Sequence, residues 1–111
     1  MNPVAVELSL LTDHLLKEAA TSPHARTAQR VSLDHQRLRM TAIGFAAGGE
    51  LPDHKNPGEA TLQILVGRVR LSWAAGDLEL ESGMIARIPD SLHRVEALEP
   101  SVVLLTAVAL D

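Results

Sequence analysis

"DHKNPGEATLQILVG", residues 53–67, is the stretch that decides the fold, because it joins a polar turn directly to a strand. Its centre, the NPG of residues 56–58, has the residue types of a tight turn. The run that follows, residues 60–66, alternates apolar and polar side chains, which is the period of a strand with one buried face. Gly67 ends the strand, and His54 stands just ahead of the turn, where it is a candidate site residue.

Short strands are predicted along most of the chain. They are RTAQRV (26–31), RLRMTAIGF (37–45), GRVRLSW (67–73), LELE (78–81), GMIARIP (83–89), HRVEAL (93–98) and SVVLLTAVAL (101–110). Residues 46–59 are interpreted as a long loop region. The last run is apolar on both faces, so we expect it to be covered on both, by the core on one side and by a helix, a second sheet or a second subunit on the other. Many short strands spaced by turns are typical of an all-β sandwich or barrel.

The N-terminal segment has a different pattern, that of an amphipathic helix. Asn2 is a suitable cap and Pro3 suits a first turn, and a helix of about 17 residues is expected to end before Pro23. The 111 residues therefore read as one domain, with a helix in residues 1–22 and a β-barrel in residues 23–111.

Composition excludes several classes of function. The chain has no cysteine, which excludes disulfides, thiolate metal sites and cysteine nucleophiles. Its net charge is −4, which disfavours binding to nucleic acid. Phe45 and Trp73 are its only aromatic residues, so stacking platforms for bases are missing. No window is apolar enough to span a membrane, and the N-terminus does not have the pattern of a signal peptide. We expect a cytoplasmic protein with no membrane or nucleic-acid partner.

Two groups of residues resemble the two motifs of the cupin family. In the first motif Gly48 and His54 match, and Gly67 matches the closing glycine. Asn56 stands where a second histidine is usual, and Ala60 stands where a glutamate is usual.

The second motif is matched by Gly83, Pro89 and His93, although the gap from proline to histidine is one residue shorter than usual. Ser91 lies near the usual glycine, and the resemblance covers residues 37–108. It implies a double-stranded β-helix, or jelly roll, with both histidines facing one cavity. Such proteins often dimerise through a β-face, so a homodimer is expected.

The resemblance also implies a divalent metal (zinc, iron, manganese or nickel) held by three histidines and one carboxylate. Of that set, His54 and His93 are present as metal-ligand candidates. Glu59 is one position from the expected carboxylate, which on a strand puts it on the opposite face unless a bulge intervenes. Gln63 falls on that same face, and His35 would have to reach over from a turn.

Three functions stay open at this stage, and whether the chain is an enzyme is not decided. The first is a module that binds a small polar or anionic molecule with His54, Asn56 and His93, since neutral imidazole both donates and accepts hydrogen bonds. The second is a metal-dependent oxygenase, isomerase or lyase acting on a small oxygenated substrate. The third is a sensory or scaffold domain.

Basic residues on the strand 67–73 have two interpretations. Arg68 and Arg70 alternate with core residues and are expected to pair with Glu79 and Glu81 across a hairpin. The alternative is an anion clamp. Trp73, on the apolar face of the same strand, is interpreted as a core residue.

Overall fold

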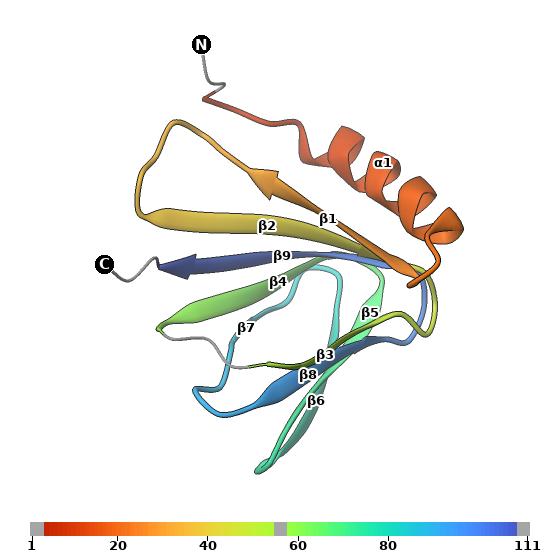
Figure 1. The fold of residues 1–111 in the computed structure, drawn as a ribbon, viewed down its shortest axis with the longest axis vertical. Coiled ribbons are helices and arrows are strands. Elements are labelled where there is room, and N and C mark those ends of the chain that lie inside the picture. Colours follow the sequence, from red (N-terminus) through yellow and green to blue (C-terminus); the bar gives the residue numbers. More distant parts are fainter. Residues whose placement is uncertain (1–3, 55–57, 109–111) are drawn as a thin grey trace.

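The computed structural model describes residues 4–54 and 58–108, which form one helix packed on two antiparallel sheets (Figure 1). The elements in these residues are α1 (Leu8–Thr21), β1 (Arg26–Val31), β2 (Leu38–Phe45), β3 (Glu50–His54), β4 (Ala60–Val66), β5 (Arg68–Trp73), β6 (Gly76–Glu81), β7 (Ile85–Arg87), β8 (His93–Ala97) and β9 (Ser101–Val108). Sheet A has the order β1-β2-β9-β4-β7, and sheet B has the order β3-β8-β5-β6. The predicted jelly-roll barrel with one N-terminal helix is confirmed.

The main core lies between the two sheets. Along β4 and β5 every second residue is buried, as the alternation in the sequence predicts. The fully buried side chains of this core include Phe45, Leu62, Ile64, Val69, Leu71, Val95 and Val103. Burying an aliphatic side chain of this size stabilises the fold by roughly 1.5–3 kcal/mol.

A second core lies on the outer face of sheet A, under α1. It contains Leu11 and Leu15 of the helix together with Val31, Ala42 and Val102 of β1, β2 and β9. The apolar run at residues 101–110 was expected to be covered by a helix, a second sheet or a second subunit. At Val102 the covering element is the helix. Gly44 permits the close approach, because a Cβ there would lie 2.7 Å from the carbonyl oxygen of Leu15.

The helix begins later than predicted. Residues 4–7 are not helical and α1 starts at Leu8, while Asn2 and Pro3, the predicted cap and first turn, lie outside the described residues. Most helical stability comes from packing of the apolar face. Val4 is 79% exposed, so the segment before Leu8 has no such packing at this residue. The helix ends at Thr21 as expected, before Pro23. With 14 residues, α1 is too short to cross a membrane, and the described residues contain no longer helix.

The prediction of a continuous loop over residues 46–59 is wrong, because Glu50–His54 forms the edge strand β3. Its sequence, ELPDH, has no apolar alternation, and Pro52 removes a backbone donor. Proline is tolerated on edge strands and at bulges, and β3 is both at an edge and irregular between Leu51 and His54. The strand forms because β8 supplies backbone partners from a distant part of the chain.

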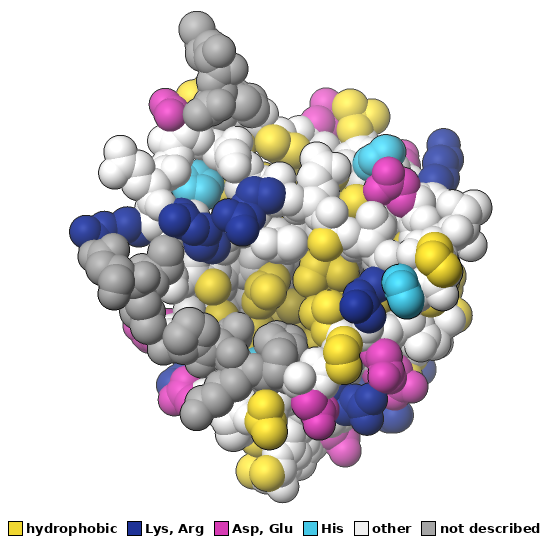
Figure 2. Space-filling view, in the orientation of Figure 1, with side chains coloured by type: hydrophobic (Ala, Val, Ile, Leu, Met, Phe, Trp, Pro, Cys, Tyr) yellow, Lys and Arg dark blue, Asp and Glu magenta, His cyan; other side chains and the backbone are white. Residues whose placement is uncertain are grey.

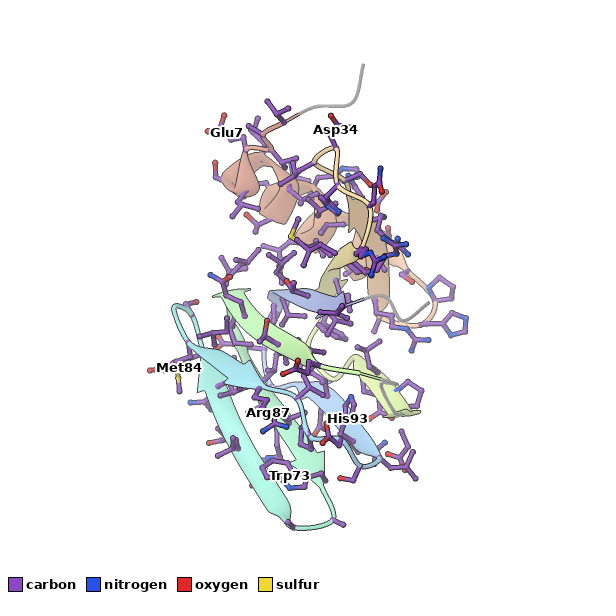
Figure 3. The ribbon with its side chains drawn as sticks, turned by 90° about the vertical axis from the view of Figure 1, so that its left-hand side faces the viewer. Glu7, Asp34, Trp73, Met84, Arg87 and His93 are labelled. Atoms are coloured by element: carbon purple, nitrogen blue, oxygen red, sulfur yellow. The ribbon has the colours of Figure 1, made fainter. Side chains whose placement is uncertain are left out.

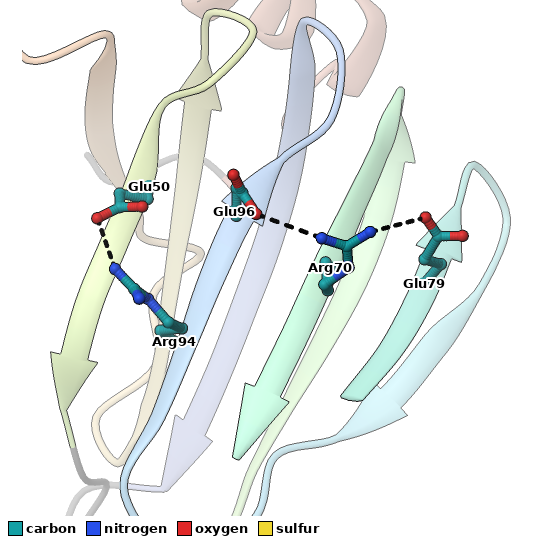
Figure 4. Close-up of polar contacts among 5 residues, drawn as sticks. All are labelled: Glu50, Arg70, Glu79, Arg94 and Glu96. Atoms are coloured by element: carbon teal, nitrogen blue, oxygen red, sulfur yellow. Dashed lines mark hydrogen bonds and ion pairs between the residues drawn. The ribbon is translucent and has the colours of Figure 1, made fainter. Parts of the chain in front are cut away.

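The outer face of sheet B carries a row of ion pairs (Figure 4). Arg70 lies 3.4 Å from Glu79 and 3.7 Å from Glu96, and Arg94 lies 2.7 Å from Glu50. Arg68 is in register with Glu81, and Arg70 with Glu79, as the hairpin pairing predicts. The anion clamp is therefore not the arrangement found for Arg70. Exposed pairs of this kind each contribute about 0–1 kcal/mol.

Candidate functional site

Backbone pairing brings the two motif histidines together at one end of sheet B. His93, the first residue of β8, is the register partner of His54 at the end of β3. On its other side, His93 is the register partner of Trp73 at the end of β5. His54, His93 and Trp73 therefore hold successive positions across three neighbouring strands, although some forty residues separate the two histidines in sequence.

A bulge in β3 produces this alignment. Leu51 is paired with Val95 and His54 with His93, so β3 uses three steps where β8 uses two. A regular ladder would instead put Asp53 opposite His93, because a shift of one residue exchanges the two faces of a strand. The extra residue is thus what brings His54 into register with His93.

The ring of His93 is buried and held in one orientation. Its side chain is 1% exposed, and Nδ1 lies 3.0 Å from the carbonyl oxygen of Ser91. A carbonyl oxygen only accepts, so Nδ1 carries the hydrogen and donates this bond. In the neutral ring, Nε2 then carries the lone pair. This is the arrangement that a histidine uses to accept a hydrogen bond from a ligand or to bind a metal.

A pocket of about 320 Å³ opens at this end of the sheet. It is lined by Asp53, Ser72, Trp73, Ala74, Leu92, His93 and Arg94. Trp73 and His93 belong to the inner side of sheet B, while Ser72 and Arg94 belong to its outer side, so the pocket wraps around the end of the strands. Figure 3 shows His93 and Trp73 at the same end of the molecule. The volume is at the lower end of the range for small-molecule sites.

The donors required for a complete metal site do not come together in the described residues. Ala60, at the position of the usual glutamate, is buried in the barrel core. Pairing of β4 with β9 is regular from Ala60 to Ile64, so no bulge turns the preceding Glu59 inward. Gln63 is on the same outer side as Thr61, as predicted.

His35 does not reach the site either. It lies beside Asp34, and Figure 3 shows Asp34 at the opposite end of the view from His93. No group of three or more histidine, cysteine or acidic side chains that suits a metal ion occurs within residues 4–54 and 58–108. The donor set therefore does not fit the four-ligand site that the family resemblance implies. Asn56, the third predicted ligand-binding residue, lies outside the described residues.

Sequence reasoning did not identify Trp73 as a site residue. It does pack against the main core, as interpreted, but it is only partly buried and its remaining surface lines the pocket. No local pattern signals this, because the pairing of β5 with β8 decides that Trp73 lies next to His93.

Comparison with known proteins identifies a fold. No family model matches the chain, and no curated protein matches it. An RmlC-like cupin from Desulfovibrio desulfuricans is 23% identical, with 79% of this chain and 85% of that chain covered and a TM-score of 0.68. KdgF from Halomonas sp. is 18% identical, with 82% and 84% covered and a TM-score of 0.71. A salicylate 1,2-dioxygenase from Pseudaminobacter salicylatoxidans is 18% identical, with 96% of this chain but only 36% of that chain covered, and a TM-score of 0.76.

Proposed function

Because this chain has the cupin fold, we propose that it binds a small polar or anionic molecule at the end of the barrel where β8 begins. The observation that carries the proposal is the state of His93, which is buried, oriented through Nδ1 and in register with His54. A buried, oriented imidazole beside a pocket is a polar group that can select a ligand.

The chemistry of the proposed site is hydrogen bonding without turnover. The imidazole of His93 is proposed to hydrogen-bond to the ligand, as an acceptor when neutral and as a donor when protonated. His54 and Asn56 are proposed to contact the same ligand. Trp73 supplies an apolar wall on the other side of His93.

Trp73 also makes the proposal directly measurable, since it is the only tryptophan in the chain. Small organic acids and polyols are screened one by one against the protein. We expect a ligand among them to change the fluorescence of Trp73 without being converted to a product. His93→Gln should weaken binding about tenfold, the effect of losing one or two hydrogen bonds in a site of this kind. His14→Gln is the matched control, because His14 is exposed and forms its only described ion pair with Glu18. Equal affinity of the His93→Gln variant would contradict the proposal.

The second candidate is a metal-dependent cupin enzyme, an oxygenase, isomerase or lyase. It is favoured by the register pairing of two histidines and by the lone pair on Nε2 of His93. One of the similar structures is named as a dioxygenase. The incomplete donor set argues against it, so no reaction step is assigned. Elemental analysis of protein purified without chelators separates the candidates: stoichiometric metal, lost in both His54→Ala and His93→Ala, would favour the enzyme.

Two wider expectations accompany the proposal. The protein is proposed to act in the cytoplasm, and to be a homodimer. Exposed apolar side chains on sheet A, Ile85 at 63% and Val108 at 47%, suit an interface with a second copy. Light scattering should give twice the mass of one chain, and a monomer at all concentrations would exclude the dimer.

A further inference from the structure

Two arginines face the inner side of sheet A. In β2, Ile43 and Phe45 belong to the core between the sheets, so the two-residue period of a strand puts Arg39 and Thr41 on that same side. Arg30 of β1 is the register partner of Thr41 and shares its side. The intervening residues Met40 and Ala42 pack under α1 instead, which supports this assignment.

The arginine on β2 lies at the end of the barrel that contains the proposed site. Arg39 is in register with Ala107 of β9, and Ala107 is in register with Ala60 at the start of β4. In Figure 1 this end of sheet A is on the same side of the molecule as the end of β3 and the start of β8, which carry His54 and His93. Packed sheets lie about 10 Å apart, a distance that a ring-sized organic acid can span.

Three other arginines, unlike these two, have carboxylate partners. Arg70, Arg87 and Arg94 each lie within ion-pair distance of a carboxylate. No carboxylate within residues 4–54 and 58–108 pairs with Arg30 or Arg39. Arg39 donates to the backbone carbonyls of Gln36 and Leu38, which are neutral groups that orient the guanidinium and supply no countercharge.

The surface between the two sheets has the composition of a site for an amphipathic anion. Figure 2 shows a hollow with a hydrophobic floor there, and Lys and Arg side chains lie along one rim of it. Leu51, Leu105 and Ala107 are among the partly buried apolar residues that pack against the main core. A small ligand bound to such a surface needs an apolar body and one negatively charged group.

We propose that Arg39, assisted by Arg30, binds the carboxylate of a small organic acid whose apolar body lies in the barrel mouth and whose far end reaches His93. This rests on the proposed function and names its ligand class. Guanidinium matches a carboxylate with two parallel hydrogen bonds, and the hydrophobic floor selects an organic acid over inorganic phosphate.

The test uses benzoate and cyclohexanecarboxylate as probes, with benzamide as the uncharged analogue of benzoate. Binding is followed by Trp73 fluorescence and by saturation-transfer NMR. We expect the two acids to bind in preference to benzamide, and Arg39→Gln to weaken their binding about tenfold. Arg39→Lys should retain part of the affinity. Arg68→Gln is the matched control, since Arg68 is an exposed arginine on the outer side of sheet B.

The outcomes separate this inference from the proposed function. Unchanged benzoate affinity in Arg39→Gln, with weakened affinity in His93→Gln, would overturn the role of Arg39 and leave the proposed site intact. Unchanged affinity in both variants, with no response of Trp73, would overturn both. Inorganic phosphate is the last comparison. The assignment to organic acids would be overturned if phosphate binds as tightly as benzoate and loses as much affinity in Arg39→Gln. Thermal melts of each variant verify that the fold is retained.

Discussion

His93 at the start of β8 is the direct register partner of His54 at the end of β3, and a one-residue bulge in β3 creates this pairing. Bulges commonly occur at sheet edges and next to binding sites, where they re-aim a strand. The two motifs are thereby joined through backbone hydrogen bonding before any ligand is considered. The proposed site depends on this relationship, and the first prediction tests it.

The two histidines should be energetically coupled. Residues that share a site show coupling of about 0.5–3 kcal/mol in a double-mutant cycle, whereas distant residues are additive. We expect such coupling between His54→Gln and His93→Gln, both in the free energy of unfolding and in ligand affinity. Urea denaturation and Trp73 fluorescence titration measure the two quantities. Strict additivity in both would show that the two side chains act separately.

The helix should stabilise the barrel through one face only. Leu15 is fully buried against sheet A, while Leu10 of the same helix is 66% exposed. Leu15→Ala should lower the free energy of unfolding by about 2–5 kcal/mol, because it leaves a cavity. Leu10→Ala, an identical chemical change, should alter it by no more than about 0.5 kcal/mol. Similar denaturation midpoints for the two variants would contradict this packing.

Gly67, the closing glycine of the first motif, should be required for a steric reason. It has φ +90°, and a Cβ there would lie 2.2 Å from Oγ of Ser101 and 2.5 Å from the carbonyl oxygen of Pro100. Gly83 has nearly the same φ, +89°, but open space around it. Gly83→Ala should therefore cost only the left-handed strain, about 1–2 kcal/mol. Gly67→Ala should cost clearly more, and equal losses in thermal stability would count against the steric explanation.

Ser101 should contribute to stability through its hydroxyl group. It is fully buried, and Oγ accepts a hydrogen bond from the backbone N–H of Arg68 at 3.0 Å while lying 2.7 Å from the carbonyl oxygen of Glu99. Ser101→Ala leaves that N–H without its acceptor, which should cost about 1–3 kcal/mol. Ser72→Ala, on the more accessible side of β5, is the control and should have little effect. Calorimetry of both variants provides the comparison.

The ion pairs on the outer face of sheet B should matter little. Arg70 and its partners Glu79 and Glu96 are each more than 40% exposed. Arg70→Ala should change the free energy of unfolding by no more than about 1 kcal/mol, and the difference should shrink as salt is added. A larger loss that persists in 1 M salt would indicate that the network is shielded from solvent.

Sequence alone determined the elements whose local pattern reports burial. The alternation in residues 60–66 and 68–73 predicted strands with the observed buried faces, and the amphipathic pattern of the N-terminal segment predicted a helix with one buried face. Burial on one side of a strand or helix imposes a period on the sequence, so these elements can be predicted from the sequence alone. The motif spacing also named His54 and His93.

Tertiary structure alone decided the composition of the site. The strand Glu50–His54 has no period of its own, because its stability comes from backbone bonds to a strand about forty residues away. For the same reason the sequence did not indicate that Trp73 lies beside His93, or that Arg39 faces the inside of the barrel at that end. Pairing between distant strands depends on backbone groups, which all residues except proline carry alike, so the side chains of the sequence do not reveal it.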